Sequence, residues 1–233
     1  MSKRKKKPRK STILRKIADG RGTIAKASET KFEPHTCVYG ANIIYVDGIF
    51  TKDDCEDIIE YHHTWKSKGG KITEQNEKTR EVISIEDEYR ICTLYCPPDG
   101  IKDSLEGLDW LHAKLLDAIT GVNQDYYKFD IEAFIEAPNL MRYDADTGGH
   151  YNYHLDIGIA KPNCWRKLSY SLMLNDDFEG GKLGFKTGKG VVEYGPTVGR
   201  IVIFPSYILH KVFPVTSGRR WALVGWAHGA SFR

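Results

Sequence analysis

The sequence has no stretch of 18 consecutive apolar residues, and no apolar segment follows its basic start, MSKRKKKPRK. These absences argue against a transmembrane helix and against a secretory signal. The five cysteines form an odd, scattered set without a Cys-x-x-Cys pair, and no Asn-x-Ser/Thr acceptor occurs. Neither a disulfide framework nor a thiolate zinc site is therefore predicted. We expect an intracellular, cytoplasmic protein, which is nuclear if the host is eukaryotic.

Charge is distributed unevenly along the 233 residues. The first ten residues hold seven of the 34 basic side chains and no acidic one, so the rest carries 27 basic against 31 acidic residues. We predict a basic, disordered N-terminal arm over residues 1–33 and a single domain over residues 42–230. The arm is a candidate for binding nucleic acid or a targeting receptor; the alternative is a solvated tail without a specific partner.

Two helices are expected before the middle of the chain. Thr51 suits an N-cap, with Asp53 and Asp54 in the first turn of the helix that follows. A second helix is expected over residues 104–120, with Gly121 as its stop. The charged stretch 71–90 is predicted to be an exposed loop or flap over the functional site.

Short extended segments dominate the rest of the chain. Residues 42–48, 129–135, 140–143, 200–204 and 221–226 have the composition of strands. In the run 168–174, leucines and a tyrosine alternate with Ser169, Ser171 and Met173, which is the period of a strand. Short strands separated by glycine turns and preceded by helices favour a β-sandwich or jelly roll supported by helices.

Three residues in the β-rich part could hold a metal ion. His154 and Asp156 are two positions apart, so on a strand both side chains would point to one face. His210 follows the predicted strand 200–204 and a Pro-Ser-Tyr turn, where it could face the same point. Two histidines and one carboxylate are the ligands of non-haem Fe(II) centres with open coordination positions. No fourth ligand is evident, which argues against structural zinc.

Arg220 lies ten residues after His210, directly before the apolar run 221–226 of a predicted buried strand. A buried guanidinium is costly unless it meets an anion, and it can hold a carboxylate through two hydrogen bonds. A dicarboxylate that binds the metal at one end and Arg220 at the other would account for both features. The alternative is an arginine that points outward and has no such role.

Together these residues resemble a known family. The residues that carry the resemblance are, in order, Tyr143, His154, Asp156, Leu174-Asn175, Glu179-Gly180-Gly181, Leu183, Phe204-Pro205-Ser206, His210, Pro214-Val215, Gly218, Arg220 and Trp226. The combination resembles the 2-oxoglutarate- and Fe(II)-dependent dioxygenases, and within them the prolyl 4-hydroxylase branch. The resemblance implies a mostly β fold with flanking helices around a double-stranded β-helix, the jelly-roll or cupin-like core.

The resemblance also implies roles for single residues. The metal ligands would be His154, Asp156 and His210, and Arg220 would hold the distal carboxylate of 2-oxoglutarate with a further contact from the Tyr143 hydroxyl. The residues expected to complete the site are Ser169 or Ser171, as an added hydroxyl to that carboxylate, and Trp226, as part of the pocket wall.

The implied activity is hydroxylation of a C–H bond, with peptidyl proline as the favoured target and release of succinate and CO2. Fe(II) is the expected metal, 2-oxoglutarate the cosubstrate, and ascorbate a supporting reductant. A peptide or protein is the expected partner. Two alternatives stay open: the same chemistry on another side chain, a nucleobase or a small metabolite, and a non-catalytic jelly-roll module tethered by a basic nucleic-acid-binding arm.

Overall fold

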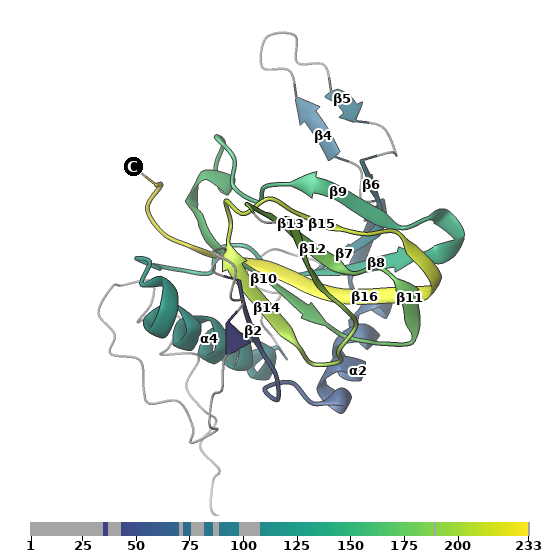
Figure 1. Cartoon of the computed structure of the whole chain (residues 1–233), viewed down its shortest axis with the longest axis horizontal. Coiled ribbons are helices and arrows are strands. Elements are labelled where there is room, and N and C mark those ends of the chain that lie inside the picture. The colour runs from purple at the N-terminus through teal and green to yellow at the C-terminus, as the bar shows by residue number, and fades with distance from the viewer. Residues whose placement is uncertain are drawn as a thin grey trace, which may run out of the picture.

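The computed structural model describes residues 35–36, 43–69, 72–75, 82–85, 89–97, 108–188 and 190–232. A larger and a smaller antiparallel sheet face each other, and two helices cover the opposite face of the larger sheet (Figure 1). The expected fold, a jelly-roll core with flanking helices, is confirmed. The predicted arm, residues 1–33, lies outside the described residues.

The larger sheet has the order β1-β2-β14-β10-β16-β8-β7-β3, and β11 pairs with β16 at its side. Its strands are β1 (His35–Thr36), β2 (Ile44–Val46), β3 (Lys66–Gly69), β7 (Thr93–Cys96), β8 (Asn139–Asp144), β10 (Arg166–Met173), β11 (Phe178–Gly180), β14 (Ile201–Pro205) and β16 (Val215–His228). β16 lies between β10 and β8. Residues 221–226 lie in this strand, as expected, and are buried or half-buried on both faces.

The smaller sheet has the order β13-β12-β15-β9-β6. Its strands are β6 (Arg90–Ile91), β9 (His150–His154), β12 (Leu183–Thr187), β13 (Gly190–Tyr194) and β15 (His210–Val212). The registers place His210 opposite both His154 and Phe185. The three central strands β12, β15 and β9 therefore carry two of the predicted ligands side by side.

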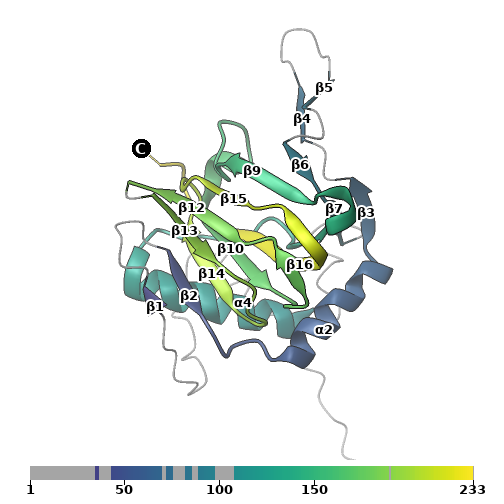
Figure 2. The ribbon, with the colours of Figure 1, turned by 45° about the vertical axis from the view of Figure 1, so that its right-hand side comes forward.

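Two helices lie against the larger sheet on the side away from β9 and β15 (Figure 2). α2 (Lys52–Glu60) starts at the predicted N-cap, where the Asp54 amide donates to Thr51 Oγ1 over 3.1 Å and the Thr51 amide donates to Asp54 Oδ2 over 2.7 Å. α4 (Asp109–Val122) is tied to it by Lys114 Nζ, 2.5 Å from Asp54 Oδ2. Short helical turns are found at Tyr61–His63, Asn123–Tyr127, Ala145–Thr147 and Asn163–Trp165.

Three local expectations from the sequence are wrong. Gly121 does not stop the second helix, because α4 runs to Val122 and continues as a π-turn whose end is fixed by the Asn123 side chain, hydrogen-bonded to the Phe129 backbone at both its oxygen and its nitrogen. Residues 129–135 form only an isolated bridge at Ala133. The stretch 71–90, predicted to be an exposed loop or a flap, contains a hairpin, β4 (Ile72–Gln75) with β5 (Val82–Ile85), so it is not a loop throughout.

Two apolar clusters fill the spaces between the layers. The first joins α2 and α4 to the larger sheet and contains Leu168, Tyr170 and Leu172 of β10. The second lies between the two sheets and contains Met173 with residues of β12 and β15. The alternation predicted along β10 therefore separates a face toward the helices from a face toward the space between the sheets.

Candidate functional site

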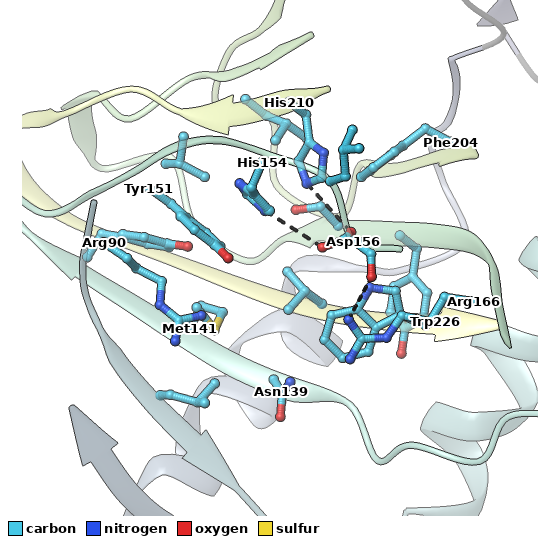
Figure 3. A pocket seen from close by; sticks show the side chains of 18 of the residues that line it. Arg90, Asn139, Met141, Tyr151, His154, Asp156, Arg166, Phe204, His210 and Trp226 are labelled. Atoms are coloured by element: carbon cyan, nitrogen blue, oxygen red, sulfur yellow. Dashed lines mark hydrogen bonds and ion pairs between the residues drawn. The ribbon is translucent and has the colours of Figure 1, made fainter. Parts of the chain in front are cut away.

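The three predicted metal ligands converge at one end of the space between the sheets. His154 is the last residue of β9, Asp156 follows in the adjoining loop, and His210 is the first residue of β15. The Nε2 atoms of His154 and His210 lie 3.6 and 3.5 Å from the two carboxylate oxygens of Asp156. One ligand atom from each residue lies within 4.8 Å of the others, a set that could hold a metal ion (Figure 3).

Backbone carbonyls orient both imidazoles. Nδ1 of His154 lies 2.8 Å from the Asn152 carbonyl, and Nδ1 of His210 lies 2.9 Å from the Ile208 carbonyl. A carbonyl can only accept, so each Nδ1 carries the proton and each Nε2 offers a lone pair toward Asp156. This tautomer is the one that binds a metal through Nε2, with a carbonyl as the partner of the other nitrogen.

Asp156 is held on both sides of its backbone. Its amide donates to the Ser206 carbonyl over 3.0 Å, and its own carbonyl accepts from Arg166 Nη1 over 3.0 Å. Burial alone would raise the pKa of the Asp156 carboxyl, but the imidazoles of His210 and His154 and a hydrogen bond from Ser169 outweigh it, and the pKa is lowered. The pKa of His154 falls to about 4, mainly because of burial. A neutral imidazole beside a carboxylate is the donor set that a divalent ion requires.

A cavity of about 290 Å³ adjoins these residues and contains Arg220 at its wall. Arg220 is 1 % exposed, and its guanidinium lies 5.1 Å from the centre of the Tyr143 ring. Its Nε and Nη2 atoms have no hydrogen-bond partner among the described residues. A buried guanidinium with two unused donors beside a cavity fits a carboxylate ligand.

The other predicted residues lie at or near the cavity. Tyr143, Ser171 and Trp226 line it. Ser169 is buried next to it, where its hydroxyl hydrogen-bonds with Ser206 Oγ over 3.0 Å and also with the Asp156 carboxylate. Burial raises the pKa of the Tyr143 hydroxyl, which keeps this group protonated and able to donate.

Three lining residues were missed by sequence reasoning. Tyr151 stacks on the His154 ring with 3.5 Å between ring centres, and Arg90 lies 4.9 Å from the centre of the Tyr151 ring. The Arg166 guanidinium lies over a Trp226 ring, with its central carbon 3.5 Å from the ring centre. Tyr151 lies three positions before His154, so strict alternation would put it on the opposite face. An irregularity in the pairing of β9 with β15 brings both rings to the same side.

The comparisons with known proteins agree with this geometry. Residues 138–228 match the family model of the 2OG-Fe(II) oxygenase superfamily. A PKHD-type hydroxylase of Synechococcus sp. strain CC9902 is 39 % identical over 84 residues, which is 35 % of this chain and 37 % of that protein. One of Pseudomonas fluorescens is 26 % identical over 193 residues, 79 % of this chain and 77 % of that protein. The matches of 34 % identity or more span 37 to 50 % of the relatives' length.

Solved structures share the fold. A Pseudomonas putida prolyl-4-hydroxylase has a TM-score of 0.59 at 19 % identity, over 82 % of this chain and 94 % of that one. A prolyl hydroxylase of Trichoplax adhaerens, in complex with a peptide of hypoxia inducible factor, has a TM-score of 0.59 at 18 % identity, over 81 % and 84 %. The expected resemblance to 2OG-Fe(II) oxygenases is confirmed by the family model, and these structures show that the fold is that of known prolyl hydroxylases. Among the helices of the described residues, none has the length and apolarity needed to cross a membrane.

Proposed function

We propose, on the premise that residues 138–228 are similar to the 2OG-Fe(II) oxygenase superfamily, that this chain hydroxylates peptidyl proline. The observation that carries the proposal is the pairing of the His154, Asp156 and His210 cluster with the buried Arg220 across one cavity. When bound together, Fe(II), 2-oxoglutarate and dioxygen would supply the oxidation, which converts 2-oxoglutarate to succinate and CO2 and inserts one oxygen atom into the C–H bond.

The chain's own residues bind and orient. His154, Asp156 and His210 would hold the metal from one side, so that the other side stays open toward the cavity. Arg220 would hold the distal carboxylate of 2-oxoglutarate through its Nε and Nη2 donors, with the protonated Tyr143 hydroxyl beside it. Ser171, on the cavity wall, could add a hydroxyl contact. Fixing both ends of a flexible dicarboxylate selects one orientation before the reaction.

The walls around the metal residues are suited to exclude water. Phe204 and Tyr151 pack against the histidines, with ring centres 4.7 Å from His210 and 3.5 Å from His154.

Leu155, which lines the cavity, is 48 % exposed, and Ile159 in the same segment is fully exposed. We infer that a peptide passes over this apolar segment, which supports a peptide or protein as the substrate. The Trichoplax protein with its bound peptide is similar in fold.

The proposal is tested by succinate release from 2-oxoglutarate with added Fe(II) and ascorbate, with and without a panel of proline-rich peptides. We expect succinate that rises with peptide and disappears with EDTA, and a gain of one oxygen atom on the peptide by mass spectrometry. His154→Ala and Asp156→Ala should abolish both signals. His150→Ala, on the same strand but outside the cluster, is the matched control and should keep them.

Two results would contradict parts of this proposal. Succinate release that no proline peptide stimulates would remove peptidyl proline as the target and leave other side chains, nucleobases and small metabolites to test. Full turnover by His154→Ala would remove this residue from the metal site.

A further inference from the structure

A cluster of three ionisable side chains lies next to the cavity and has no part in the proposed chemistry. Arg166 begins β10, His228 ends β16, and Glu136 lies in the segment before β8. Their side chains are 12 %, 3 % and 18 % exposed. Removing charged side chains from water is costly unless they form hydrogen bonds and ion pairs with one another. The contacts within this cluster therefore have to be accounted for.

Both carboxylate oxygens of Glu136 accept hydrogen bonds from the two other side chains. Arg166 Nε donates to Glu136 Oε1 over 2.8 Å, and Arg166 Nη2 donates to Oε2. The Ile135 amide approaches His228 Nδ1 at 3.4 Å, so that nitrogen accepts and Nε2 donates to Glu136 Oε1 over 2.9 Å. Burial alone would raise the pKa of Glu136, yet the hydrogen bonds from Arg166 and His228 lower it. The carboxylate is therefore ionised and fixes the plane of the guanidinium.

A β-bulge turns Arg166 toward the cavity. Arg166 is opposite His228 and Leu168 is opposite Ala227, so two residues of β10 correspond to one of β16. Strict alternation would put Arg166 on the same side as Leu168, which packs in the cluster toward the helices. The extra residue, Lys167, reverses the side, and Arg166 lines the cavity instead.

The guanidinium then contacts two parts of the site at once. Its Nη1 donates to the Asp156 carbonyl over 3.0 Å, and its central carbon lies 3.5 Å from the centre of a Trp226 ring (Figure 3). The opposite side of Asp156 is fixed by the Ser206 carbonyl. Arg166 therefore contacts both the peptide group that follows Asp156 and an aromatic ring of the cavity wall.

We propose that Arg166 is a positioning residue, which Glu136 and His228 hold in place and which sets the orientation of the Asp156 carboxylate and of the Trp226 ring. This inference rests on the proposed function, because it presupposes that Asp156 binds the metal. A guanidinium has the planar shape to stack on an indole while it makes three in-plane hydrogen bonds, and an ammonium does not. The geometry of Arg166, and not only its charge, is therefore what the site uses.

The test compares Co(II) binding to the full chain and its variants, through the visible absorption of the bound ion and through its dissociation constant. Loss of a hydrogen-bond partner of a metal ligand weakens metal binding about 10- to 100-fold. We expect a loss in this range and an altered spectrum for Arg166→Gln and also for Arg166→Lys, which keeps the charge. Glu136→Gln should weaken binding in the same direction, because the guanidinium loses its ionic partner.

Arg200 provides a matched control. It forms a two-bond pair with Asp47, at 2.8 and 2.7 Å, lies 4.2 Å from the centre of the Tyr45 ring, and does not line the cavity. Arg200→Gln therefore breaks the same kind of pair and aromatic contact, and should change the Co(II) dissociation constant by less than about twofold. Thermal unfolding shows whether each variant folds. If an Arg166 variant does not fold, the Co(II) affinity of Glu136→Gln is the test.

The outcomes separate this inference from the proposed function. If the unmodified chain binds no Co(II), or His154→Ala binds it equally well, the proposed metal site fails. If the metal site stands but Arg166→Gln matches Arg200→Gln in affinity and spectrum, the positioning role is overturned. Recovery of normal binding by Arg166→Lys would also overturn it, since charge alone would then be sufficient.

Discussion

Replacing the buried arginine should stabilise the ligand-free protein and remove its response to 2-oxoglutarate. Arg220 is 1 % exposed, burial lowers its pKa, and its Nε and Nη2 donors are unpaired among the described residues. Apolar residues of similar volume in place of a buried charge often stabilise a protein by about 1–4 kcal/mol. Arg220→Met keeps most of the length of the side chain, so we expect a gain within that range. For a domain of this size the gain corresponds to a rise in Tm of about 2–4 °C per kcal/mol.

Binding of 2-oxoglutarate should narrow this difference in stability between the two proteins. A ligand at 100 times its dissociation constant stabilises a protein by about 2.7 kcal/mol. With Mn(II) and 2-oxoglutarate, the unmodified chain should therefore gain about this amount, whereas Arg220→Met should gain only the part due to the metal. Urea unfolding with and without the two ligands measures both terms.

The neighbouring residue provides the control. Arg219 is 54 % exposed and lies 2.5 Å from Asp144, so Arg219→Met should change stability by no more than about 0.5 kcal/mol and keep the response to 2-oxoglutarate. Two results would refute the reasoning. A ligand-free Arg220→Met less stable than the unmodified chain would mean that the fold itself satisfies the guanidinium, and a full response to 2-oxoglutarate would remove Arg220 from the cosubstrate site.

Two further predictions concern the fold. Burial would raise the pKa of Asp54, but hydrogen bonds from Lys114 and Thr51 lower it, so its stabilisation is present above the unfolded-state pKa and lost as the pH falls through the folded-state value. Asp54→Asn should cost about 1 kcal/mol at neutral pH and flatten the loss of stability below about pH 4, measured by urea unfolding across pH. Gly225→Ala would place Cβ 2.3 Å from Tyr170 Oη and should cost about 1–3 kcal/mol. Tyr170→Phe in the same chain should recover part of this loss; no recovery would contradict the steric explanation.

The sequence predicts those features of the fold that depend on residues close together in the chain. Alternation along β10 places Leu168 and Leu172 toward the helices and Met173 between the sheets. Thr51 is the N-cap of α2 because capping depends on side chains within one turn. The two-residue spacing of His154 and Asp156, and the turn before His210, predict that these residues could converge, and the structure brings them together.

Features that depend on long-range pairing could not be predicted. Arg166 lies two positions before Leu168, so strict alternation would turn its side chain toward the helices. Only the bulge at Lys167 turns it toward the cavity. Gly121 looks like a helix stop, but the structure outside the helix decides otherwise, because the Asn123 side chain holds the Phe129 backbone. Bulges and π-turns add one residue without an obvious composition signal.

The position of β16 restricts how this site can change through insertions and deletions. Arg220, Val224 and Trp226 line the cavity from one strand that pairs with β8 and β10. A residue inserted between Arg220 and Trp226 would move every side chain on one side of the insertion to the opposite face. The cavity can therefore be reshaped along β16 by substitution but not by gains or losses of length.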